Sequence, residues 1–184
     1  QRLAYERGAS PASPIVASGP NGGNPHARPG ERALQRGDVV TLDLGVYLEG
    51  YPGDITRNVA LGAPAARWEA AHALVVEANR AGIAAAGPGV PAQDVDRAAR
   101  TVIEAAGHGA QFVHRTGHGL GLEMHEPPYL VAGNRAPLAP GNVVTVEPGV
   151  YWAGEGGVRV EDDCLITADG VEVLTTFPRA LRRV

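Results

Sequence analysis

The sequence lacks the residue patterns of several classes of protein. Its 184 residues include a single cysteine, Cys164, so neither a disulfide framework nor a cysteine metal cluster can form within the chain. No apolar run approaches the roughly 18 residues of a membrane-spanning helix, and no charged and then apolar leader opens the chain. We therefore expect a cytoplasmic protein without a membrane partner.

Charge and composition exclude two further classes. The net charge is -4 and the longest basic cluster, 179–183, is a short tail, so we expect no nucleic-acid partner. A hydrophobic fraction of 44% with 20% charged residues excludes whole-chain disorder, and 25 glycines with 15 prolines predict many turns. The length fits one domain over residues 1–184.

The sequence contains one segment twice. Residues 37–48 (GDVVTLDLGVYL) return as residues 141–152 (GNVVTVEPGVYW), and each copy begins at a glycine and is rich in β-branched residues, as strands are. Each copy also carries one carboxylate among apolar neighbours, Asp43 in the first and Glu147 in the second. The duplication predicts an α+β domain of two halves, related by a pseudo-twofold axis, that aim both acids at one point.

The two halves are expected to differ in their helices. Apolar residues at helical spacing predict helices over 64–86 and 92–106, followed by a strand near 111–114, ahead of the second copy. Only the loop-like residues 1–36, with one short strand near 15–17, precede the first copy. We therefore expect the first half to lack its helices, and the chain to be a carboxy-terminal portion of a longer protein or a processed chain.

Carboxylates dominate the predicted site. An antiparallel strand is expected just after the first copy, and a hairpin of the two places Asp43 and Asp54 on one face. Glu147 and Glu161, the latter in a predicted strand over 157–167, repeat the arrangement. Taken singly, each acid is more often a partly exposed strand residue or a salt-bridge partner. Two matching pairs favour a ligand role.

Four converging carboxylates would repel one another, and their pKa values would rise until protons were held. A pair of divalent ions removes this repulsion. Oxygen-rich ligation with one imidazole, from His118, suits Mn²⁺, Co²⁺ or Zn²⁺ in a site with two ions roughly 3.5–4 Å apart and a nucleophilic water between them. The hard carboxylates favour manganese.

A glycine-rich loop over 114–128 holds three of the six histidines, His114, His118 and His125. Its alternating glycines allow close approach of the backbone to a ligand, as in a loop that lines a pocket. The spacing does not complete the G-x-G-x-x-G fingerprint of dinucleotide-binding proteins, and His125 lacks the second histidine of a zincin motif four residues on.

Five motifs in chain order resemble the pita-bread metallopeptidases, family M24. They are IVASGPN with NPH (15–26), Asp43 with DITR (54–57), HRTGHGLGLEMHE (114–126), TVEPG (145–149) and VRVED (158–162). Within the family, they resemble the proline-specific branch of Xaa-Pro dipeptidases (prolidases) and Xaa-Pro aminopeptidases (aminopeptidase P). The resemblance implies a pita-bread fold with a dinuclear metal site.

The resemblance also implies a role for each matching ligand. Asp43 would chelate one ion, and His118 and Glu147 would hold the other. Asp54 and Glu161 would bridge the two ions. Glu147 would in addition carry a proton from the bridging water to the leaving amine.

Four further residues match positions around the metal in the family. His26, His114 and His125 would contact the substrate and stabilise the tetrahedral intermediate, and Arg159 matches the arginine two positions before the bridging glutamate. From spacing alone, Arg159 fits a solvent-facing strand residue equally well. The histidines at positions 72 and 108 match nothing and are expected at the surface.

The implied activity is hydrolysis of the bond between an amino-terminal residue and a following proline, by a homodimer acting on Xaa-Pro peptides. The alternative from another class is a non-catalytic pita-bread binding or scaffold protein. Among enzymes it is a methionine aminopeptidase, although the histidine at position 114 and residues 159–163 resemble the proline-specific branch. The sequence leaves the choice between dipeptidase and aminopeptidase P open.

Overall fold

The first half of the fold is built on one long hairpin. In the computed structural model, which describes residues 1–12 and 14–184, β3 (Val39–Leu48) pairs with β4 (Tyr51–Ala60) along its whole length. The turn residues Glu49 and Gly50 both have positive φ, which matches the twist of the paired strands. Three short strands complete this sheet: β1 (Ser10–Pro11), β2 (Ile15–Ser18) and β12 (Arg182–Arg183).

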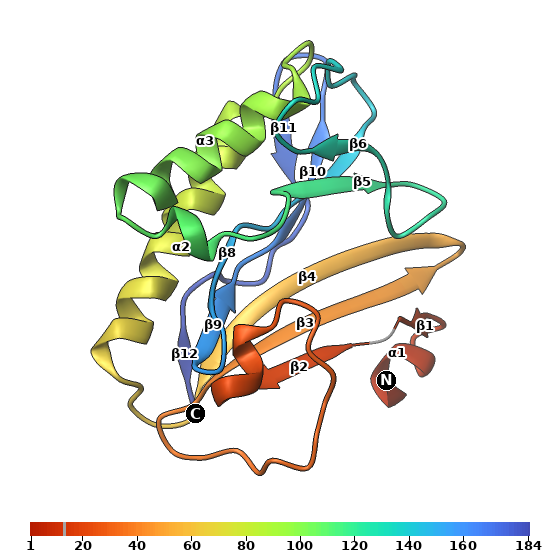
Figure 1. Ribbon diagram of the computed structural model, residues 1–184. Coiled ribbons are helices and arrows are strands. Elements are labelled where there is room, and N and C mark those ends of the chain that lie inside the picture. Colours follow the sequence, from red (N-terminus) through yellow and green to blue (C-terminus); the bar gives the residue numbers. More distant parts are fainter. Residues whose placement is uncertain (13) are drawn as a thin grey trace.

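The second half contains a sheet of five strands in the order β11-β10-β7-β5-β6. Its strands are β5 (Gly117–Leu120), β6 (Glu126–Leu130), β7 (Val143–Val146), β10 (Asp162–Ile166) and β11 (Val171–Val173). A separate antiparallel pair, β8 (Gly149–Trp152) and β9 (Gly156–Arg159), leads from this sheet toward the first one (Figure 1).

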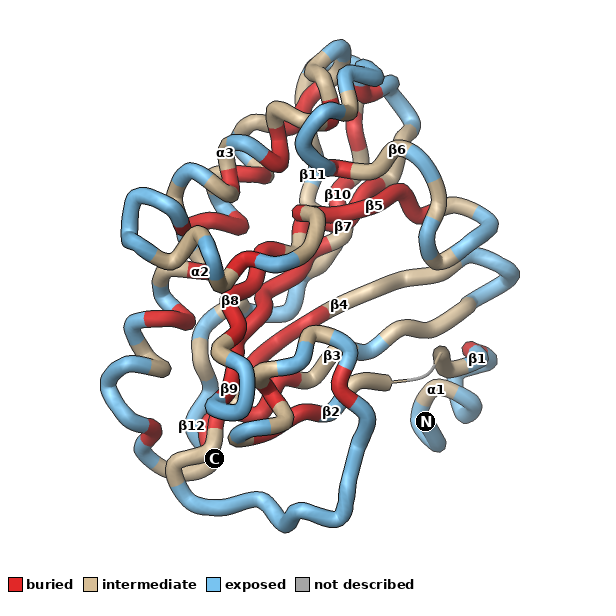
Figure 2. Tube along the Cα trace, viewed as in Figure 1, coloured by how far each residue is buried: buried red, intermediate tan, exposed pale blue. Residues whose placement is uncertain are grey.

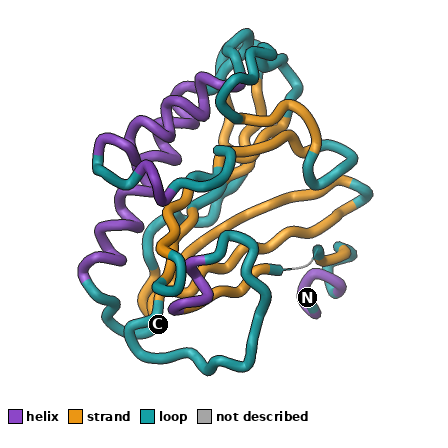
Figure 3. The backbone as a smooth tube through the Cα atoms, viewed as in Figure 1, coloured by secondary structure: helices purple, strands orange, loops and turns teal. Residues whose placement is uncertain are grey.

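Two long helices cover one side of the second half (Figure 3). They are α2 (Ala66–Ala85) and α3 (Ala92–Ala105), and both predicted helices are thus confirmed. The shorter elements are α1 (Arg2–Tyr5) and the 3₁₀ turns η1 (Gly19–Gly23) and η2 (Gly109–Gln111). Among the described residues no helix is both long and apolar enough to cross a membrane.

Buried residues are concentrated where the helices meet the strands of the second half (Figure 2). One cluster, around Val75, Ile103 and Val150, joins both helices to β8 and β9. A second cluster lies beneath the five-stranded sheet and includes Val95, Leu130, Val144, Val146 and Ile166. On β3, by contrast, two leucines stay in solvent: Leu44 is 45% exposed and Leu48 is 52% exposed. As expected, no long helix precedes β3 among the described residues.

The second copy of the repeat is not one strand, and this expectation was wrong. β7 ends at Val146 and β8 begins at Gly149, so the strand breaks at Glu147 and Pro148. The strand predicted over 157–167 breaks in the same way, between β9 and β10. Pro148 explains the first break, because proline has no N–H to donate to a strand ladder.

Three smaller expectations were also wrong. Residues 111–114 form no strand, because the chain leaves η2 in an irregular conformation there. The predicted glycine-rich loop contains β5, whose Gly117 packs so closely that a Cβ would lie 1.9 Å from the carbonyl oxygen of Thr145. His72, expected at the surface, is only 5% exposed in α2.

Candidate metal centre

A cavity of about 540 Å³ lies where the two halves meet. Carboxylates, histidines and two arginines, from both halves of the fold, form its wall. The structure places every site residue predicted from the sequence there: His26, Asp43, Asp54, His114, His118, His125, Glu147, Arg159 and Glu161. Their individual roles remain predictions.

The first pair of acids is placed by the β3–β4 hairpin. Asp43 lies opposite Thr56, and Asp54 lies opposite Gly45. These pairs are two residues apart along each strand, so both acids point to the same face of the hairpin, as expected.

The second pair of acids lies at the two strand breaks. Glu147 follows β7, and its backbone N–H donates to the carbonyl oxygen of Thr116 at 2.7 Å. Glu161 precedes β10, and its N–H donates to the carbonyl oxygen of Thr56 at 3.2 Å, in an isolated bridge to β4. The breaks therefore let both glutamates bond to elements other than their own strand partners.

Asp54, His118 and Glu161 form the tightest group. Each offers one ligand atom, and these three atoms all lie within 4.8 Å of one another. Burial lowers the pKa of His118 to about 4, so its imidazole is neutral at pH 7. Its Nδ1 donates to the carbonyl oxygen of Gly119 at 3.1 Å, which leaves a lone pair on Nε2. This is the tautomer that binds a metal ion.

The ionised carboxylates of the cavity repel one another unless a positive charge lies between them. Burial, with repulsion from Asp43, raises the pKa of Asp54 to about 7. Burial raises the pKa of Glu147 to about 8 despite the opposing charge of Arg159. Burial also raises the pKa of Glu161 well above its ordinary range. A divalent ion would supply the missing charge, so this donor set fits a metal centre.

Tyr151 organises the other side of the cavity. Its hydroxyl accepts from Nη1 of Arg159 at 2.6 Å and donates to Nε2 of His114 at 2.9 Å. The second ring nitrogen, Nδ1, donates to the carbonyl oxygen of Arg115 at 2.7 Å. Nη2 of Arg159 donates to Asp43 at 2.5 Å. Both nitrogens of His114 are thus engaged, and the substrate contact expected of it requires one of these bonds to break.

Sequence reasoning did not single out Tyr151, although the repeat contains a signal for it. The tyrosine recurs in both copies, as Tyr47 and Tyr151. Only the second copy buries it, and burial raises the pKa of the Tyr151 hydroxyl to about 12.

Helix α3 supplies a further support that the sequence did not reveal. Asp96 accepts bonds from both the backbone N–H and the hydroxyl of Thr116, at 3.2 and 2.8 Å. Arg100 donates to Asp96 and to the carbonyl oxygens of Phe112 and His114. Asp96 and Arg100 therefore fix residues 112–116. This segment carries His114, and the carbonyl oxygen of Thr116 accepts from the backbone N–H of Glu147.

The metallopeptidase family M24 matches residues 1–168. The chain belongs to this family. Its mixed α+β architecture with few helices is the pita-bread fold of M24 proteins. A protein of Mycobacterium tuberculosis named "Probable dipeptidase PepE" is 44% identical over 168 residues, which are 91% of this M24 chain and 45% of that protein. The chain spans about half the length of the curated relatives it matches.

Two solved structures of M24 proteins are closely similar. A prolidase from Thermococcus sibiricus is 44% identical with a TM-score of 0.91, over 93% of this chain and 47% of that one. An X-Pro aminopeptidase from Thermotoga maritima is 39% identical with a TM-score of 0.94, over 99% of this chain and 52% of that one.

Proposed function

We propose that the protein is a dinuclear metallopeptidase that hydrolyses the bond between an amino-terminal residue and a following proline. The observation that carries the proposal is the convergence of acids from both copies of the repeat, together with His118, on one cavity. The similarity to a prolidase and to an X-Pro aminopeptidase supports the choice of substrate.

Five residues would hold the metal. Asp43 would bind one ion, His118 and Glu147 the other, and Asp54 and Glu161 both. When bound, two divalent ions supply a nucleophilic water and polarise the scissile carbonyl. Mn²⁺ is our choice of native ion because all the donors except the imidazole are hard carboxylates.

The other groups of the cavity would orient the substrate and move the proton. Glu147 lies at the cavity wall, from which its carboxylate can deliver a proton to the proline nitrogen as the bond breaks. His125 packs against His118 with ring centroids 4.2 Å apart, and its imidazole would stabilise charge on the carbonyl oxygen. Arg159 keeps Asp43 oriented through their ion pair.

The position of Arg115 supports dipeptides, rather than longer peptides, as the preferred substrates. It lines the cavity with its guanidinium over the ring of Tyr129, 4.8 Å from the centroid. Within the described part of the chain, Arg159 pairs with Asp43 in the cavity, and no ion pair uses Arg115. A free carboxylate at the end of a dipeptide would give this cation a partner.

The Arg115→Gln variant tests that assignment. Because a bond to a charged group is lost, we expect KM for an Xaa-Pro dipeptide to rise about 10–100-fold. KM for an Xaa-Pro-Xaa tripeptide should change less than the dipeptide value. An equal change for both peptides would show that Arg115 does not read the carboxyl end.

The activity itself is tested by titrating Mn²⁺ into metal-free protein and assaying four peptides: an Xaa-Pro dipeptide, an Xaa-Pro-Xaa tripeptide, an Xaa-Ala dipeptide and a Met-Ala-Xaa tripeptide. We expect metal-dependent cleavage before proline only, with the dipeptide preferred. Preferred cleavage of the tripeptide would select aminopeptidase P, and cleavage after amino-terminal methionine in a Met-Ala-Xaa peptide would select a methionine aminopeptidase.

Absence of cleavage by folded, metal-loaded protein would favour a binding or scaffold role instead. We extend the proposal to a homodimer, which the family resemblance implies, and to the cytoplasmic location expected from the sequence. Light scattering of the purified protein tests the assembly state, and a monomer mass would contradict it.

A further inference from the structure

We propose that Arg57 is a positioning residue for Glu161, and that it ties the carboxy-terminal segment of the chain to the metal centre. The inference rests on the proposed role of Glu161 as a ligand. Arg57 does not line the cavity, so its effect on the chemistry would pass through the backbone of that acid.

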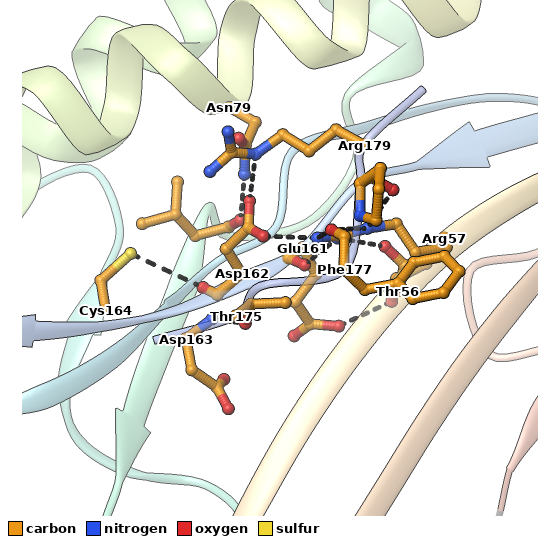
Figure 4. A network of polar contacts seen from close by, with 12 residues as sticks. Thr56, Arg57, Asn79, Glu161, Asp162, Asp163, Cys164, Thr175, Phe177 and Arg179 are labelled. Carbon is orange, nitrogen blue, oxygen red and sulfur yellow. Dashed lines mark hydrogen bonds and ion pairs between the residues drawn. The ribbon is translucent and has the colours of Figure 1, made fainter. Parts of the chain in front are cut away.

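Arg57 is buried, and every donor of its guanidinium is used (Figure 4). Nη1 donates to the carbonyl oxygens of Glu161 at 2.5 Å and Thr56 at 2.9 Å. Nη2 donates to Oδ1 of Asp162 at 2.6 Å and to the carbonyl oxygen of Phe177 at 2.7 Å. Nε faces the carbonyl oxygen of Pro178 at 3.1 Å. One side chain thus joins β4, the second strand break and the carboxy-terminal segment.

Asp162 balances this buried charge. It is fully buried, and its two carboxylate oxygens accept from two arginines: Oδ1 from Arg57 and Oδ2 from Nε of Arg179, each at 2.6 Å. Apolar residues can stabilise a core as well as a buried ion pair does. The directional bonds of the arginine fork are what apolar residues could not replace.

Three hydrogen bonds hold Glu161, and one of them comes from Arg57. Its N–H donates to Thr56, its carbonyl oxygen accepts from Arg57, and Oε2 of its side chain accepts from the hydroxyl of Thr56 at 2.6 Å. These bonds fix both the backbone and one carboxylate oxygen, and they come from β4 of the first half. Among the described residues, Oε1 receives no such bond, and Glu161 lines the cavity. The arrangement aims one oxygen at the metal position.

Arg57→Lys tests the inference because it keeps the charge beside Asp162 and removes the planar fork. Arg32→Lys is a matched control, since Arg32 makes a two-bond fork with Asp38 and neither residue lines the cavity. The readouts are hydrogen exchange of the metal-free protein, Mn²⁺ affinity by calorimetry, the electron paramagnetic resonance spectrum of bound Mn²⁺, and kcat with KM.

We expect hydrogen exchange at residues 160–163 to rise at least tenfold in Arg57→Lys and to stay unchanged in α2. Mn²⁺ affinity should fall about 10–100-fold, as for other groups that orient a ligand. The coupling between the two ions should change, and kcat should fall while KM stays within about twofold. Arg32→Lys should match the wild type in every readout.

Unchanged exchange at residues 160–163 would overturn the inference whether or not the protein binds metal, which separates this test from the test of the proposed function. A uniform rise in exchange over the whole chain would assign Arg57 a structural role only and would also overturn it. If Arg57→Lys fails to fold, Arg179→Gln removes the second donor of Asp162, and the same local changes are expected at smaller amplitude. Their absence there would overturn the inference as well.

Discussion

The two copies of the repeat are identical at seven of twelve positions and have different structures. In the first, β3 and β4 pair without interruption from Val39 to Leu48. In the second, β7 pairs with β10 and β8 pairs with β9. Residues 147–148, between β7 and β8, and residues 160–161, between β9 and β10, belong to no strand. The interruption falls at Glu147 and Glu161, the two acids of that half.

The difference shows two ways in which a strand can present a carboxylate. In the unbroken hairpin, Asp43 and Asp54 face the cavity because strand alternation points them there. At the breaks, the backbones of Glu147 and Glu161 leave their own ladder and bond to Thr116 and to β4. The broken copy thereby joins its acids to other elements of the fold, and the candidate metal centre lies where those elements meet.

The largest expected effect is a difference in activity between variants of Glu147 and Asp43, the equivalent acids of the two copies. Glu147→Gln removes both a proposed ligand and the proposed proton carrier, so we expect kcat to fall about 10²–10⁴-fold. Asp43→Asn removes a proposed ligand and the charge partner of Arg159 but no proton carrier, and excess Mn²⁺ should restore much of its activity. Steady-state kinetics over a range of Mn²⁺ concentrations checks the pair. Equal recovery of both variants in excess metal would show that the copies do not differ in role.

The second effect concerns the glycines at equivalent positions of the repeat. A Cβ at Gly149 would lie 2.5 Å from the hydroxyl of Tyr151, which Arg159 holds in place, so Gly149→Ala should cost about 1–3 kcal/mol by overpacking. A Cβ at Gly45 would meet the end of the flexible Met124 side chain, at 2.7 Å.

Gly45→Ala should therefore cost less than its counterpart in the second copy. Chemical denaturation of both variants measures the difference. An equal loss of stability would indicate that the second copy is no more tightly packed than the first.

A smaller effect should appear in the pH dependence of the metal-free protein. Asp54 and Glu147, one acid from each half, have pKa values raised to about 7 and about 8. Between pH 6.5 and 8 the folded protein holds protons that the unfolded chain has released, so stability should fall as the pH rises, on the order of 1 kcal/mol. Bound Mn²⁺ should abolish this slope. Melting temperatures measured between pH 6.5 and 8 check this prediction. A melting temperature of the metal-free protein that rises with pH would contradict it.

Other titrating groups do not alter the sign of that slope. Burial lowers the pKa of His72, His114 and His118 to about 4, below an unfolded value of about 6.5. These histidines therefore destabilise the fold only as the pH falls below about 6.5. Asp54→Asn should make the loss of stability shallower from about pH 4 to about pH 7, where only the folded wild-type chain holds this proton.

Local patterns in the sequence predicted the parts of the fold that depend on local structure. Helical periodicity located α2 and α3, and strand alternation placed Asp43 and Asp54 on one face. The break of the second copy also has a local signal, Pro148, which is unusual inside a paired strand. The strand at Gly117 was missed because its glycines look like a loop, although they serve close strand packing.

The supports of the site could not be predicted in this way. Arg57 contacts Glu161 and Phe177, which lie 104 and 120 residues away along the chain. Asp96 reaches Thr116 across 20 residues. No periodicity relates such positions, because their contacts depend on how the two halves dock. The family resemblance brought the cavity residues together, but it assigned nothing to these supporting groups.

One measurement tests most directly whether the two unlike copies build a single dinuclear centre. Calorimetric titration of metal-free protein with Mn²⁺, with cleavage of an Xaa-Pro dipeptide assayed at each point, gives stoichiometry and activity together. We expect two ions per chain and activity that rises with occupancy. A single ion with full activity, or two bound ions without any cleavage of the dipeptide, would contradict it.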